Sequence, residues 1–146
     1  MLRWEKGMAK SVEARRVGQV IRRYLRGKGY TLSQPKKHGQ TGVDITATRG
    51  ESTLFMEVIG FQDHPPTRSR EFYECFFRVI SRDGGNPSDV LAMGLPRWFK
   101  DGMRQRKRNY SVAWEKLGRA FPNLKIWYVD TEQNVIEEFP WAKPFN

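Results

Sequence analysis

The sequence predicts an α/β fold, in which a mixed central sheet is flanked by helices and the elements follow the order α-β-β-β-α-β-α-β. Apolar side chains recur at helical spacing in the regions 12–26 and 69–82. Two apolar runs, 43–48 and 54–59, flank a short polar stretch that contains glycine, which is the pattern of a β-hairpin. The run 90–95 is apolar throughout, as in a strand buried on both faces. Strands interleaved with helices in this way are typical of a mixed sheet between helical layers.

The individual elements follow from the same patterns in chain order. Ser11 is a suitable N-cap for the first helix, whose apolar stripe includes Val17, Ile21 and Leu25. The arginines of this helix mostly lie off that stripe: Arg15, Arg16, Arg22, Arg23 and Arg26. The predicted elements are helix 12–26, strands 30–32, 43–48 and 54–59, helix 69–82, strand 90–95, one helix or a broken pair of helices over 97–118, strand 124–129, and a short edge strand over 135–139.

Length and composition favour one cytoplasmic domain. A chain of 146 residues is long enough to bury its own core, so we expect a single domain over 1–146. No apolar run approaches the length of a membrane span, and membrane insertion is therefore not expected. Cys75 is the only cysteine, which excludes an internal disulfide and a cysteine-based zinc site. The N-terminus also lacks the apolar centre of a secretory signal.

The charge of the chain points to a polyanionic partner. Twenty-six Lys and Arg residues oppose 16 Asp and Glu residues, which gives a net charge of +10 and an isoelectric point near 10.0. Such an excess favours nucleic acid, although a basic but merely solvated surface would have the same composition. The densest basic run is 104–108. The residues expected to contact phosphates are Lys36, Lys37, Arg68, Arg104, Arg106, Lys107 and Arg108.

Two carboxylates stand out in the predicted hairpin. Asp44 and Glu57 each lie within an otherwise apolar strand, where a charged group is costly to bury unless something compensates it. Two such carboxylates brought together suggest a site for a hard divalent cation, which takes oxygen ligands.

The stretch from Gly42-Val43-Asp44 through the hairpin to Glu57-Val58-Ile59 resembles the core motif of the PD-(D/E)XK nuclease superfamily. The resemblance covers roughly residues 11–130 and is nearest to the Holliday-junction-resolvase and Mrr-type branch. It implies a restriction-endonuclease-like fold and Mg²⁺-dependent (or Mn²⁺-dependent) hydrolysis of phosphodiesters. Asp44, Glu57 and the carbonyl of Val58 would hold the metal ion.

The resemblance also implies a role for an acid in the first helix, for which Glu13 is the candidate. An ordinary first-turn acid, stabilised by the helix dipole, is an equal alternative. The family pattern places a catalytic lysine where this chain has Ile59, which can neither carry charge nor exchange a proton. Gln62 or Arg70 could supply the missing group from nearby, with Arg68 and Arg78 as weaker candidates.

Two further explanations of Ile59 remain open. The chain could be a nuclease-like fold that binds DNA or RNA without cutting it, or Asp44 and Glu57 could be structural, held by backbone amides or arginines. Outside the nuclease resemblance, the competing class is a basic accessory or adaptor protein. DNA is the first expectation for the nucleic acid, and family members are often homodimers.

Overall fold

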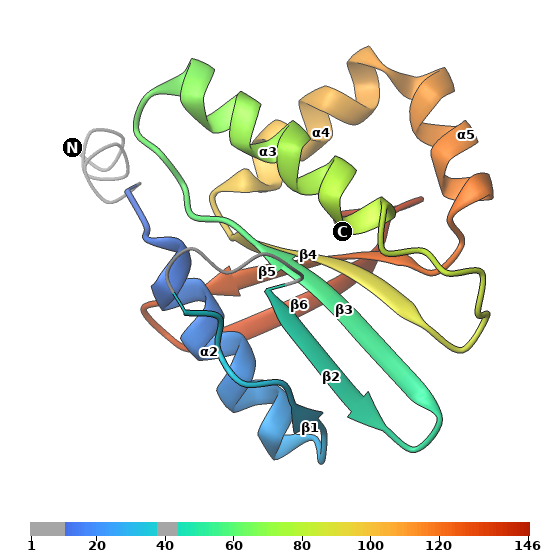
Figure 1. The fold of residues 1–146 in the computed structure, drawn as a ribbon. Coiled ribbons are helices and arrows are strands. Elements are labelled where there is room, and N and C mark those ends of the chain that lie inside the picture. The colour runs from blue at the N-terminus through green and yellow to red at the C-terminus, as the bar shows by residue number, and fades with distance from the viewer. Residues whose placement is uncertain (1–10, 38–43) are drawn as a thin grey trace.

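A six-stranded mixed sheet runs through the centre of the protein (Figure 1), in a computed structural model that describes residues 11–37 and 44–146. The strands are β1 (Thr31–Leu32), β2 (Ile45–Arg49), β3 (Ser52–Val58), β4 (Val90–Pro96), β5 (Leu124–Asp130) and β6 (Val135–Pro140). They lie side by side in sequence order. β1, β2 and β3 are antiparallel neighbours, β4 and β5 continue parallel to β3, and β6 is antiparallel at the far edge.

Helices cover both faces of this sheet. α2 (Ala14–Gly27) lies on one face, and α3 (Pro65–Ile80), α4 (Phe99–Asn109) and α5 (Ser111–Ala120) lie on the other (Figure 1). The predicted α/β class, with a mixed sheet flanked by helices, is therefore confirmed. None of the helices in the described ranges has the length and apolar character that a membrane span requires.

Each face of the sheet has its own apolar core, and β4 contributes to both. Ala92 packs with the buried stripe of α2, whereas Leu91 and Met93 pack with the helices of the opposite face. Alternate residues of a strand point to opposite faces, so a strand between two cores must be apolar at every position. The uninterrupted apolar run had predicted this placement.

The first helix begins later than the sequence indicates. Its N-cap position is Glu13 rather than Ser11, and Glu13 makes no side-chain capping hydrogen bond. Val12 instead forms an antiparallel bridge with Phe61, and the two residues exchange backbone hydrogen bonds of 3.0 and 2.8 Å. This bridge holds the backbone before Glu13 extended. It joins the start of α2 to the segment that leaves β3.

Helix α3, by contrast, begins earlier than predicted. Pro65 and Pro66 form its first turn instead of breaking the chain before it, because proline lacks only an N–H that has no partner in a first turn. The imidazole of His64 accepts a hydrogen bond from the backbone N–H of Thr67 at the N-cap.

The predicted helical region 97–118 is a broken pair, since α4 and α5 are separated at Tyr110, whose backbone leaves the helical conformation. The predicted edge strand is β6, which pairs along its whole length with β5.

Candidate functional site

The β2–β3 hairpin brings the two motif carboxylates together. Ile45 pairs with Met56, so Asp44 and Glu57 are the next residues along the two strands. Glu57 lies on the face covered by α3, and its carboxylate is near enough to that of Asp44 for the two to repel each other. The neighbouring motif residues Gly42 and Val43 lie outside the described part of the chain.

Glu57 is buried, with a side chain only 1% exposed, and two arginines of the α3 region face it. Arg78 donates from Nε to Glu57 Oε1 at 3.3 Å, and Arg82 Nε lies 3.5 Å from Oε2 without forming a hydrogen bond. Burial raises the pKa of the Glu57 carboxyl, Asp44 raises it further, and Arg82, Arg78 and Lys36 oppose this rise. The folded protein therefore disfavours the charge on Glu57 in spite of its cationic neighbours.

Asp44 is partly exposed, and groups of the same chain also hold its carboxylate. Its Oδ2 accepts a hydrogen bond of 2.8 Å from the backbone N–H of Val58, and Lys36 Nζ lies 2.9 Å from its Oδ1. The backbone carbonyl of Asp44 accepts a bond of 3.3 Å from Arg22 Nη2. Asp44 is therefore neutralised by Lys36 and fixed against β3.

This arrangement is a poor fit to the metal site that the resemblance implies. Each of the four carboxylate oxygens is in a hydrogen bond or an ion pair with a group of the chain, and Glu57 Oε2 has only the ion pair with Arg82. Within the described residues, no group of three or more His, Cys, Asp or Glu side chains could hold a metal ion. A divalent cation would have to displace Lys36 and Arg82 before it could bridge the two carboxylates.

The other residues predicted for catalysis lie away from the carboxylates. Glu13 is exposed at the start of α2 and lines a recess on the side of Thr131 and Glu132. Gln62 is exposed, and its backbone carbonyl accepts a hydrogen bond from Arg68. Arg70 is exposed and forms an ion pair of 3.5 Å with Glu74, one turn further along α3. The structure does not bring these three side chains to Glu57.

The cations that reach the carboxylates differ from those that the sequence favours. The sequence makes Arg78 a weaker candidate, assigns Lys36 to phosphate binding, and gives Arg82 no role at the site. A signal for the arginine pair was present, because Arg78 and Arg82 are four residues apart and flank the apolar stripe at Val79.

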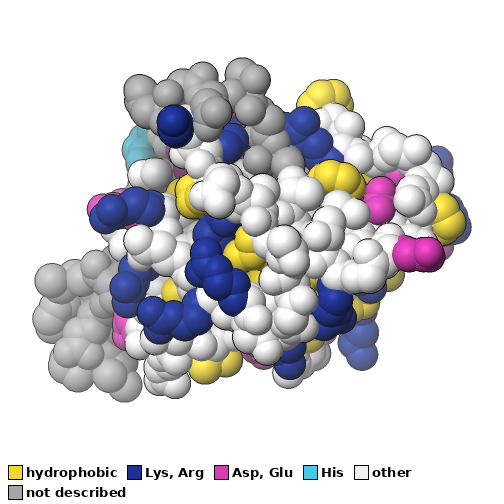
Figure 2. Space-filling model, turned by 60° about the horizontal axis from the view of Figure 1, so that its bottom comes forward, with side chains coloured by type: hydrophobic (Ala, Val, Ile, Leu, Met, Phe, Trp, Pro, Cys, Tyr) yellow, Lys and Arg dark blue, Asp and Glu magenta, His cyan; other side chains and the backbone are white. Residues whose placement is uncertain are grey.

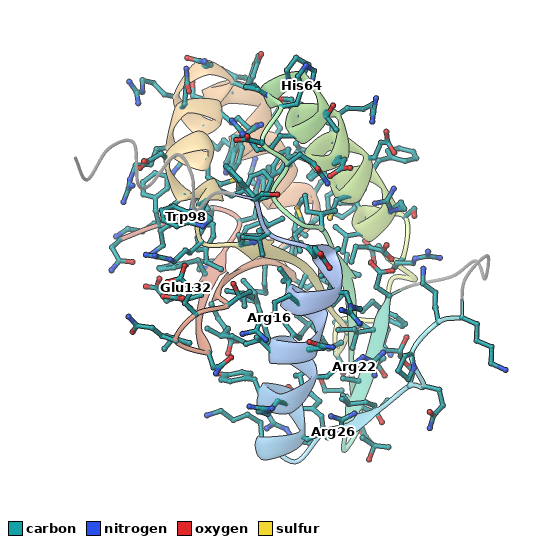
Figure 3. All side chains as sticks on the ribbon, turned by 90° about the vertical axis from the view of Figure 1, so that its left-hand side faces the viewer. Arg16, Arg22, Arg26, His64, Trp98 and Glu132 are labelled. Carbon is teal, nitrogen blue, oxygen red and sulfur yellow. The ribbon has the colours of Figure 1, made fainter. Side chains whose placement is uncertain are left out.

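A groove beside α2 opens onto Asp44. This α2 groove has a volume of about 450 Å³, and its lining includes Arg15, Gly18, Gln19, Arg22, Lys36 and Asp44. Figure 3 looks onto α2, from which the labelled Arg16, Arg22 and Arg26 project. Burial lowers the pKa of Arg22 from its ordinary value, and the charge of Arg26 lowers it further. The cations of this helix are therefore crowded together.

Acidic side chains compensate the α2 arginines only in part, through the charge of Asp44 near Arg22. Within the described residues, none of the five forms an ion pair with an acidic side chain, although Arg16 and Arg22 donate to backbone carbonyls of Thr131 and Ser33. The helix between Ala14 and Gly27 contains no acidic residue. On the face drawn in Figure 2, Lys and Arg side chains are more widespread than acidic side chains. The surface around α2 is therefore strongly positive.

The basic run 104–108, in contrast, does not form one surface. Arg104 pairs with Asp101 at 3.2 Å, Arg106 lies over the ring of Phe72, and Lys107 donates to a carbonyl near the C-terminus. Arg108 is exposed.

The remaining residues predicted to contact phosphates are separated in the same way. Arg68 lies over the ring of Phe61, and Lys37 is exposed in the segment before β2. The predicted phosphate contacts are thus spread over several parts of the molecule, and only Lys36 among them lines the α2 groove.

No protein-family model, no curated protein and no solved structure matches this chain, so its function must be inferred from the arrangement of its own residues.

Proposed function

We propose that the protein binds nucleic acid along the α2 groove, on a nuclease-like scaffold whose two carboxylates are neutralised by cations of the chain itself. The observation that carries this proposal is the row of α2 arginines without acidic partners, which flanks a groove ending at Asp44. Guanidinium groups bind phosphate oxygens through charge-assisted, often bidentate hydrogen bonds. A net charge of +10 would also draw a polyanion to the protein from a distance.

The packing of α2 favours nucleic acid over a membrane surface. A helix that binds a bilayer needs an exposed apolar face. Here the apolar stripe of α2, which includes Val17, Ile21 and Leu25, is buried against the sheet. Only the cationic side of the helix is available to a partner.

The topology supports the nuclease-like scaffold. Three antiparallel strands lead through α3 into a parallel β4, and the carboxylates occupy the second and third strand regions. This arrangement agrees with what the motif resemblance implies. The function differs from the family expectation because Lys36, Arg78 and Arg82 compensate the carboxylates.

Binding along α2 can be tested by removing two exposed cations of the helix: Arg15, which lines the groove, and Arg26, which lies one turn beyond Arg22. We expect Arg15→Gln with Arg26→Gln to weaken duplex DNA binding about tenfold and to lower the salt slope by about two, since each lost phosphate contact removes about 0.9 from that slope. The measurement is fluorescence anisotropy over a series of salt concentrations, with DNA and RNA duplexes compared.

The matched control is Lys116→Gln with Arg119→Gln, which removes the same charge from exposed positions of α5. If both double variants weaken binding equally, the effect is one of net charge, and α2 is not the binding surface.

The second candidate function is metal-dependent phosphodiester hydrolysis at the same carboxylates. It is favoured by one observation: Glu57 Oε2 is buried without a hydrogen-bond partner beside Asp44. Lys36 would then supply, from another segment, the cation that Ile59 cannot supply.

Titration calorimetry with Mn²⁺ and Mg²⁺ decides between the two functions. Binding that both Asp44→Asn and Glu57→Gln abolish, together with cleavage of DNA or RNA, would establish the hydrolase. If the wild type neither binds a metal ion, alone or with nucleic acid, nor cleaves either substrate, the non-catalytic function stands.

A further inference from the structure

A second cleft lies between α3 and α4, beyond the carboxyl ends of β3 and β4. Its volume is about 780 Å³, within the usual range for small-ligand sites. The segment after β3 contributes Phe61, and the segment after β4 contributes Trp98, which Figure 3 labels. Crevices at the carboxyl ends of parallel strands are common ligand sites in open α/β sheets.

Two large aromatic side chains are exposed at this cleft. Tyr73 of α3 is 47% exposed and Tyr110 at the α4–α5 break is 58% exposed, whereas most aromatic side chains of the described chain are more buried. Both line the cleft together with half-buried Trp98. Exposed aromatic rings grouped at one concave site provide stacking surfaces for a planar ligand.

The same cleft also contains positively charged side chains. Arg68 and Arg106 line it, and within the described residues neither forms an ion pair. The acid on the lining, Asp101, is paired with Arg104 at 3.2 Å. The cleft therefore combines aromatic faces with two cations, which is the combination that a base and its phosphate require.

Packing fixes the position of Arg106. Its guanidinium carbon lies 4.4 Å from the ring centroid of Phe72, and Nη2 is 3.3 Å from Ser69 Oγ. A Cβ at Gly102 would lie 2.7 Å from Arg106 Nη1, so glycine is what allows the guanidinium to fold back along α4. Arg106 is thus held over the cleft before any ligand arrives.

We infer that this cleft binds one nucleotide unit, with the base stacked on Tyr110 or Tyr73 and the phosphate held by Arg106 and Arg68. The inference rests on the proposed nucleic-acid function and adds to it a site for an unpaired nucleotide. An acidic peptide would leave the aromatic faces unused, and a purely apolar ligand would leave the two guanidinium groups desolvated and unpaired. Gln105 and Asn109 line the same cleft and offer amide groups to the edges of a base.

The test uses Gly102→Ala, which displaces the Arg106 guanidinium without removing any group, and Tyr110→Ala, which removes a stacking surface. The matched control is Gly118→Ala in α5, where a Cβ would meet only ordinary contacts, the nearest at 3.5 Å. Neither glycine substitution should weaken the fold, because alanine is the better helix former. The probes are 5′-mononucleotides, inorganic phosphate, and a DNA duplex with or without a single-stranded tail.

We expect calorimetry to detect mononucleotide binding and anisotropy to show tighter binding of the tailed duplex than of the blunt one. Gly102→Ala and Tyr110→Ala should each weaken mononucleotide binding about tenfold and reduce the advantage of the tail, which is the loss expected for one charged hydrogen bond or one stacked base. Gly118→Ala should behave as the wild type.

The inference is overturned if both cleft variants retain the wild-type preference for a tail and no mononucleotide binds. It is also overturned if inorganic phosphate binds as tightly as the nucleotides, since the base would then contribute nothing. The proposed function survives either result provided that the α2 double variant still loses duplex binding. It fails separately if the α2 variant binds as the wild type does.

Discussion

Glu57→Gln replaces a buried charge with a neutral group of nearly the same shape, and its effect on stability reports what the carboxylate does in the folded protein. Relieving the burial of one ion is worth several kcal/mol, roughly, after relaxation of its surroundings. Losing the charge-assisted hydrogen bond from Arg78 costs about 1.5–3 kcal/mol. Because the side chains of Arg78 and Arg82 are 43% and 32% exposed, water solvates them when their partner is neutralised, and the loss falls at the lower end of that range.

The direction of the pKa shift decides the sign of the net effect. Burial raises the pKa of Glu57 above its ordinary value of 4.5, so the folded state holds a proton at a pH where the unfolded chain has lost it. The wild type therefore loses stability, relative to Glu57→Gln, as the pH rises from about 4.5 through the folded-state pKa. At pH 7 we expect the variant to be more stable by about 1 kcal/mol, which corresponds to about 2–4 °C in Tm.

Urea denaturation of both proteins between pH 4.5 and 7.5 measures this difference. Glu74→Gln is the matched control, because Glu74 is exposed and contacts Arg70 and Arg78 from the surface of α3. A Glu57→Gln variant that is less stable than the wild type at pH 7, by a margin that does not shrink on acidification, would refute the reasoning. It would show that the two arginines stabilise the charge by more than burial penalises it.

Three further predictions concern the packing that supports the site. The rings of Trp114 and Trp141 stack with their centroids 3.8 Å apart, and each indole N–H donates to the backbone carbonyl of the other residue. Trp141→Ala should therefore lower the free energy of unfolding, measured by urea denaturation, by about 3–5 kcal/mol. A loss below about 1 kcal/mol would contradict this packing. Gly60→Ala would place a Cβ 2.2 Å from the carbonyl oxygen of Val12, so it should cost about 1–3 kcal/mol and lower the hydrogen-exchange protection of the Val12 amide. Burial raises the pKa of the Cys75 thiol, so a thiol reagent should modify the protein only in denaturant, and rapid reaction under native conditions would show that α3 opens.

The sequence predicts the layers of this fold because the helical spacing and the strand alternation of its apolar residues are nearly undisturbed. The hairpin and the doubly buried β4 follow from alternation and from an unbroken apolar run, and the structure contains both. The starts of α2 and α3 are not predicted correctly. The start of α2 depends on the Val12–Phe61 bridge, which joins residues far apart in the chain. The start of α3 is ambiguous because paired prolines are as typical of a break before a helix as of its first turn.

The partners of the carboxylates are harder to predict, because they depend on how α3 lies over the sheet. Whether Arg70 or Arg78 meets Glu57 is set by the path of the chain between β3 and α3, which no local pattern encodes.

The run 104–108 shows why adjacent cations in a sequence need not form one surface. Consecutive residues of a helix point about 100° apart, so five adjacent cations are directed to several sides of α4. Spacing along a face is therefore a better guide to a basic surface than the density of charge in the sequence, and α2 has that spacing.

The packing of Ile59 limits which side chains its position can accept. Its side chain is only 5% exposed and belongs to the core shared with Phe72, Leu95 and the helices above them. A lysine at this position would put an ammonium group into that core, so we expect Ile59→Lys to lower the stability of the protein. The packing around Ile59 therefore leaves no room for a cation at the position where the motif that this sequence resembles has one. The cations that do face the carboxylates, Lys36, Arg78 and Arg82, come from other segments of the chain.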